Sequence, residues 1–97
     1  MSVRIHCINK SGGHHQNPHE AIEYLGWIKE ETNETARSTR LEVYKFVTEQ
    51  NGVAFVRDSY GNVAYLRGNI SAAGNPYVQT VADGKWTDNL LALPECR

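Results

Sequence analysis

Hydrophobic and polar residues follow a period of two in four stretches of this chain. These stretches are Val3–Ile8, where Ile8 breaks the alternation at its end, Val53–Asp58, Val63–Arg67 and Tyr77–Ala82. A period of two places successive side chains on opposite faces of a strand, so each stretch predicts a β-strand. The turn residues of Ser59–Asn62 join the second and third stretches into a hairpin. The last three strands are therefore expected to form an antiparallel meander.

Helical spacing replaces the alternation in the middle of the chain. Thr39-Arg-Leu-Glu42 is a capping box, in which the threonine hydroxyl and the glutamate carboxylate each accept a backbone N–H of the first turn. Leu41, Tyr44 and Val47 then share one face. We expect Asn51-Gly52 to close this main helix, and its apolar face to pack on the sheet.

A second, short helix is predicted before it. Asn17-Pro-His-Glu20 offers a cap and a proline suited to the first helical position, Ile22 and Leu25 supply an apolar edge, and Gly26 is a favoured stop. Trp27–Thr32 either continues this helix or forms a strand. We favour the strand because tryptophan and isoleucine suit a pleated surface.

The order of these elements predicts an α+β fold. We expect a small, mainly antiparallel sheet of four to five strands, with one main helix and one short helix packed on one face. The charged run Glu30–Arg37 has no apolar period and is expected to be a solvated loop or an exposed hairpin arm. Leu90, Leu91 and Leu93, followed by Pro94, should dock the tail and close the core. The whole chain, residues 1–97, is predicted to be one domain.

Composition and charge narrow the class of protein. Hydrophobic residues make up 40% and charged residues 22% of the 97, which is typical of a globular domain. The formal net charge of −1 gives no general attraction to nucleic-acid polymers or to anionic membranes. No apolar run approaches the roughly 18 residues of a membrane span, and no secretory signal is recognisable. We therefore expect a cytoplasmic protein.

The two cysteines, Cys7 and Cys96, stand at opposite ends of the chain without metal-type spacing. This arrangement favours two thiols in a reducing compartment over a disulfide. Cys7 falls on the same face as Val3 and Ile5, which predicts a buried, inert thiol.

The last quarter of the chain also carries a resemblance. Its segments Tyr77-Val-Gln-Thr80, Ala82-Asp83-Gly84, Asp88-Asn89-Leu90-Leu91 and Leu93-Pro94-Glu95-Cys96 resemble domain of unknown function family 3892, small proteins of bacteria, archaea and phages. A second match is His19-Glu-Ala-Ile22 with Leu25-Gly26. The family implies a fold-sized unit but no activity.

Residues that carry chemistry do not form a recognisable catalytic site. His14, His15 and His19 are metal-type ligands, but their spacing fits no closed zinc site, so we expect no metal or other cofactor. Asp58, Asp83 and Asp88 suit turn and capping roles. A GxSxG motif, a P-loop and a GxGxxG motif are all absent from the sequence. We expect no enzymatic activity, and rank a hydrolytic or metal-dependent enzyme last.

Aromatic and cationic residues interleave in a way that suits binding of an anionic, planar ligand. The candidate ligand-binding residues are Arg57, Tyr65, Arg67, Tyr77, Trp86, His19 and Trp27. We expect a small non-enzymatic binding module, a homo-oligomer that captures an anionic small ligand such as a nucleotide signal. By analogy, phages use domains of this size to sequester such signals. The alternative is a protein-interaction or inhibitor module that acts through an exposed sheet edge.

Overall fold

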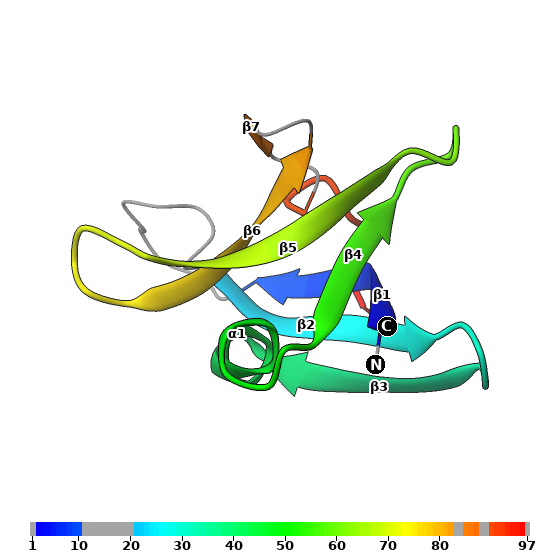
Figure 1. The fold of residues 1–97 in the computed structure, drawn as a ribbon, viewed down its shortest axis with the longest axis horizontal. Coiled ribbons are helices and arrows are strands. Elements are labelled where there is room, and N and C mark those ends of the chain that lie inside the picture. The colour runs from blue at the N-terminus through cyan, green and yellow to red at the C-terminus, as the bar shows by residue number, and fades with distance from the viewer. Residues whose placement is uncertain (1, 11–20, 83–84, 88–89, 97) are drawn as a thin grey trace.

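The computed structural model describes residues 2–10, 21–82, 85–87 and 90–96 (Figure 1). These residues form one helix and one twisted sheet of seven strands, in which neighbouring strands are hydrogen-bonded. In chain order the elements are β1 (Ser2–Lys10), β2 (Ile22–Lys29), β3 (Glu34–Thr39), α1 (Arg40–Thr48), β4 (Val53–Arg57), β5 (Val63–Ile70), β6 (Pro76–Ala82) and β7 (Lys85–Thr87). The predicted α+β class is confirmed.

The sheet is mixed but mainly antiparallel. Its strand order is β3-β2-β1-β4-β5-β6-β7, and β1 pairs parallel with β4 from Ser2↔Val53 to Arg4↔Phe55. The predicted β4–β5 hairpin and the meander through β6 are confirmed. The sheet has two strands beyond the expected four to five: β3, which forms from the end of the charged run, and the short β7.

The predicted short helix is wrong over Ile22–Leu25, which belongs to β2. Ile22 and Leu25 are 1% and 0% exposed, so burial on the core outweighs the local helix signals. Gly26 is not a helix stop either: it lies inside β2, opposite Cys7. The strand predicted at Trp27 is confirmed as far as Lys29, and Asn17–Glu20 lie outside the described residues.

The charged run after β2 forms the exposed arm of a hairpin, one of its two predicted forms. β3 pairs antiparallel with β2 from Tyr24↔Thr39 to Lys29↔Glu34. The backbone N–H of Asn33 donates to the Lys29 carbonyl at 2.7 Å, with Asn33 itself at a φ of 60°. Asparagine tolerates this left-handed conformation better than most residues, which explains its place in the turn.

The capping box of α1 is confirmed. The Glu42 N–H donates to Thr39 Oγ1 at 3.1 Å, and the Thr39 N–H donates to Glu42 Oε1 at 2.9 Å. The helix ends at Thr48, before the expected Asn51-Gly52. Val43, not Leu41, faces the sheet: Val43 is 4% exposed and Leu41 46%. Side chains two residues apart on a helix point about 200° apart around the helix axis. Because Val43 faces the sheet, Leu41 points outward.

Among the described residues, no helix has the length and apolar character needed to span a membrane.

The tail is docked, as predicted, and its docking partner is β1. β1 pairs with β4 only as far as Arg4, and further along, the tail lies against β1 instead. The Ile8 N–H donates to the Pro94 carbonyl at 3.0 Å, and the Cys96 N–H donates to the Ile8 carbonyl at 3.1 Å. Leu90 is 0% exposed, whereas Leu91 and Leu93 are half-buried against the core. The tail thus supplies one core residue and two covering ones.

The prediction of two free thiols is wrong, because Cys7 and Cys96 form a disulfide. A register shift between Ile5 and Cys7 places Cys7 opposite Gly26, while Ile5 stays opposite the next residue, Trp27. Gly26 and Trp27 are consecutive in β2 and therefore face opposite sides of the sheet. Their partners Cys7 and Ile5 also face opposite sides, and Cys7 lies on the side where it contacts the tail. A Cβ at Gly26 would collide with the sulfurs of both Cys7 and Cys96. The cytoplasmic localisation stays a prediction, and the disulfide removes the argument for it that came from two free thiols.

Candidate functional site

The outward surface of the β4–β5 hairpin carries aromatic and cationic side chains together. Ala54, Val56, Ala64 and Leu66 are buried, so the alternate residues of both strands point away from the core. We call this surface the hairpin face, made of Val53, Phe55, Arg57, Val63, Tyr65 and Arg67. The register places Phe55 directly opposite Tyr65, with their ring centroids 6.4 Å apart and the planes at 60°.

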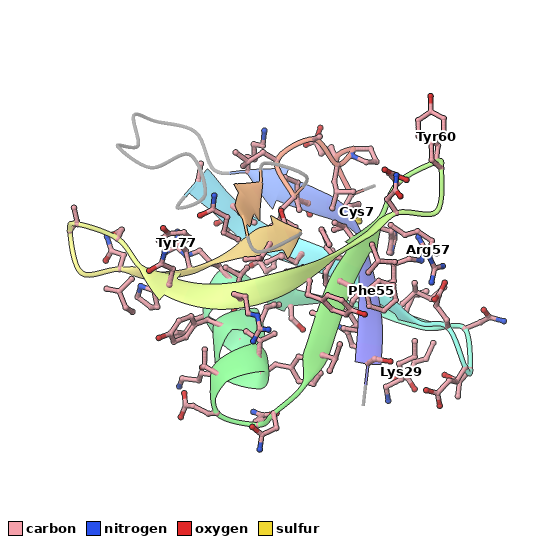
Figure 2. All side chains as sticks on the ribbon, turned by 45° about the horizontal axis from the view of Figure 1, so that its top comes forward. Cys7, Lys29, Phe55, Arg57, Tyr60 and Tyr77 are labelled. Atoms are coloured by element: carbon pink, nitrogen blue, oxygen red, sulfur yellow. A yellow bond between two sulfur atoms is a disulfide. The ribbon has the colours of Figure 1, made fainter. Side chains whose placement is uncertain are left out.

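Arg57 is held by a carboxylate of the chain itself. Its Nη1 and Nη2 donate to Glu30 Oε2 and Oε1 at 2.9 and 3.0 Å, and the guanidinium lies over the Phe55 ring at 5.4 Å (Figure 2). Arg4 Nε donates to the same carboxylate at 3.1 Å. The hydrogen bond from Arg57 is the main cause that lowers the pKa of Glu30, and the same bond raises the pKa of Arg57. Glu30 therefore offsets much of the positive charge at this end of the hairpin face.

Arg67 differs from Arg57 in this respect. No ion pair joins Arg67 to any carboxylate of the described residues, and its side chain is exposed. Tyr65, two positions earlier on the same face, is 51% exposed. The hairpin face thus has an engaged cation at Arg57 and an available one at Arg67, with the ring of Tyr65 between them.

A cleft of about 450 Å³ adjoins Tyr65 and Arg67. It forms where β4 begins at Val53 while β5 continues past it toward the end of α1. Its lining comprises Val47, Thr48, Gly52, Val53, Ala54, Tyr65, Leu66, Arg67 and Gly68. A Cβ at Gly68 would collide with Thr48 of α1, so the glycine allows β5 to pass close to the helix.

The remaining predicted ligand residues lie elsewhere. Tyr77 is only 5% exposed and stands on the far side of the molecule from Arg57 in Figure 2. Trp27 is half-buried near α1, and its Nε1 donates to Ser38 Oγ at 3.0 Å. The side chain of Trp86, on β7, and the whole of His19 are outside what the structure describes. The structure therefore brings Arg57, Tyr65 and Arg67 together and separates Tyr77 and Trp27 from them.

Three residues of this region were not among the ligand-binding residues predicted from the sequence. Phe55 could have been found, because it shares the alternation of Arg57 on the same predicted strand. Arg4 and Glu30 reach Arg57 only through the parallel β1–β4 pairing and the β2–β3 hairpin, which no local pattern reveals. Asp58, in contrast, has the predicted turn role: its Oδ1 accepts the N–H groups of Tyr60 and Asn62, each at 2.9 Å.

A metal centre finds no support in the described part of the chain. Within it, no three histidine, cysteine, aspartate or glutamate side chains gather closely enough to hold an ion. His14, His15 and His19, the candidates by residue type, lie outside the described residues, as do Asp83 and Asp88.

Comparison with known proteins places the chain in a family. Neither the curated proteins nor the solved structures give a match. The model of the family described as "Protein of unknown function (DUF3892)" matches residues 4–94, which include the hairpin face and the tail as far as Pro94. The chain therefore belongs to the DUF3892 family, as the resemblance of its tail predicts.

Proposed function

We propose that this protein is a non-enzymatic binding module that captures an anionic small ligand, such as a nucleotide, in the cleft beside Tyr65 and Arg67. One observation carries the proposal: a half-exposed aromatic ring and a guanidinium with no ion-pair partner among the described residues stand two positions apart on one strand face, at the mouth of a cleft of about 450 Å³. Clefts of this size are common for small ligands.

The two side chains suit different parts of one ligand. The Tyr65 ring offers a stacking surface for a planar group, and stacking tolerates any base because every base has a π-face. The Arg67 guanidinium can donate two parallel hydrogen bonds to a phosphate or carboxylate. Residues two apart on a strand are separated by about 6.6 Å, close enough for one nucleotide to span both.

Arg67 is a better anion contact than Arg57. Arg57 already gives both of its terminal nitrogens to Glu30, so an incoming anion would have to displace that carboxylate.

The proposal is tested with a panel of mono-, di- and cyclic nucleotides, by thermal shift and then by calorimetry. We expect at least one member to bind with a Kd well below about 1 mM. Arg67→Gln should weaken that binding at least about tenfold, whereas Arg37→Gln, on the distant strand β3, should leave it unchanged. Binding weaker than about 1 mM across the whole panel would refute the proposal.

A second candidate is a protein-interaction module, and one observation favours it. β3 is an edge strand, hydrogen-bonded to β2 alone within the described sheet, and Glu34–Arg37 are exposed. Such an edge can accept a further strand, including one from a second copy in a homo-oligomer. Light scattering after size exclusion distinguishes the two candidate functions. The protein-interaction module is supported if the protein forms an oligomer that Ala36→Lys dissociates into monomers and if nucleotides give no response.

A further inference from the structure

A second hollow, separate from the cleft, lies on the other side of α1. We call it the α1 hollow: about 290 Å³, lined by Val3, Ile5, Trp27, Ser38, Glu42, Val43, Lys45, Phe46 and Gln50. It lies where α1, which packs mainly against β5 and β6, is less closely packed against β2 and β3. The floor is apolar, since Val3, Ile5 and Val43 are core residues.

The two aromatic walls of the α1 hollow are fixed by their neighbours. The Trp27 indole is oriented by its hydrogen bond to Ser38 Oγ, 3.0 Å long. The Phe46 ring lies against the backbone of Gly52, where a Cβ would collide with three of its ring atoms. Both walls are only half-buried, so each has ring surface that no described residue covers. The hollow is thus a preformed slot for a flat or branched apolar group.

The rim carries one charge of each sign. Glu42 and Lys45 stand three positions apart on α1 and so lie on neighbouring turns of one helix face. Glu42 uses Oε1 to accept the Thr39 N–H, a bond that lowers its pKa and keeps it ionised at neutral pH. Lys45 forms no ion pair with a carboxylate of the described residues. A ligand at this rim therefore meets a carboxylate and an ammonium together.

We propose that the α1 hollow binds a small zwitterion with a large apolar side chain, that is, a free apolar amino acid. The apolar side chain enters between Trp27 and Phe46, the ligand ammonium pairs with Glu42, and the ligand carboxylate pairs with Lys45. A ligand with only one charge satisfies one rim residue and is repelled by the other. This site shares no lining residue with the cleft, so it does not depend on the nucleotide proposal.

Calorimetric titration with L-phenylalanine and L-leucine tests the site, with 3-phenylpropanoate and phenethylamine as singly charged analogues. We expect at least one amino acid to bind and to shift the Trp27 indole N–H resonance. Each analogue should bind at least about tenfold more weakly than L-phenylalanine. Equal affinity for an analogue, or no binding of either amino acid, would overturn the proposal.

Three variants complete the test. Lys45→Met and Glu42→Gln should each weaken amino-acid binding at least about tenfold. Glutamine also completes a capping box, so Glu42→Gln removes the charge and keeps the helix start. Lys10→Met, an exposed lysine of β1 outside the hollow, is the matched control and should bind as the unaltered protein does. Unchanged binding in both rim variants, with the fold intact by circular dichroism, would refute the assignment.

Discussion

Cys96 is joined to Cys7 by a disulfide although 89 positions separate them, and their Cα atoms lie 4.9 Å apart. The bond is part of a wider attachment, because the backbone of the same tail also exchanges hydrogen bonds with Ile8. Asn9 Nδ2 adds a donor to the Cys96 carbonyl at 3.1 Å. The tail is therefore fastened to β1 by both covalent and hydrogen bonds while Leu90 enters the core.

Reduction of this disulfide is expected to destabilise the protein. A cross-link that closes a long loop restricts the unfolded chain, and its loss typically costs about 2–5 kcal/mol of unfolding free energy. Urea denaturation with and without dithiothreitol measures the loss. The Cys7→Ser/Cys96→Ser double variant is the control, and reductant should leave its curve unchanged. Identical curves for the unaltered protein in both conditions would contradict the attachment.

Leu90→Ala should cost about 2–5 kcal/mol of unfolding free energy, because a fully buried side chain leaves a cavity. Leu93→Ala removes the same atoms from a half-buried position and should cost clearly less. Chemical denaturation of the two variants makes the comparison. Equal losses would mean that Leu90 has no special place in the core.

Thr39→Ala should lower the unfolding free energy by about 1 kcal/mol, since the Glu42 N–H loses its acceptor at the start of α1. Thr39→Ser keeps a hydroxyl and should recover most of this loss. Thermal melts of both variants check the prediction, and an alanine variant as stable as the serine variant would contradict it.

Acid should weaken the Arg4–Glu30–Arg57 cluster. The hydrogen bond from Arg57 lowers the pKa of Glu30 in the folded state, so the folded protein holds this proton less tightly than the unfolded chain. The resulting stabilisation is present at neutral pH and is lost as the pH falls below the usual glutamate value of about 4.5. Glu30→Gln should therefore reduce the loss of stability between pH 7 and pH 3. Glu23→Gln, an exposed residue of β2, is the control, and the same acid sensitivity in both variants would count against the cluster.

Local sequence patterns predict much of this fold. The alternation predicts β1, β4, β5 and β6, and the capping box at Thr39 marks the start of α1 to the residue. Gly26 shows why local patterns did not predict the start of β2 or the disulfide. From sequence it is a typical helix stop, yet its missing side chain makes room for a disulfide between the two ends of the chain. Nothing in its local neighbourhood signals that contact.

The candidate site is likewise only partly predictable from the sequence. The spacing of Tyr65 and Arg67 on one strand places them on one face, which the alternation alone predicts. The engagement of Arg57 by Glu30, and the contribution of Arg4, depend on which strands become neighbours. The cleft likewise forms between β5 and the end of α1, segments that the sequence does not show to be close.

Backbone amide chemical-shift mapping during a nucleotide titration tests the central claim most directly. The account predicts that the largest shifts fall on Tyr65–Gly68 and on the facing segment Val47–Val53, and that Arg67→Gln strongly reduces them at the same subsaturating nucleotide concentration. Saturating shifts confined to other segments, such as β3, or shifts that persist unchanged in Arg67→Gln, would contradict it.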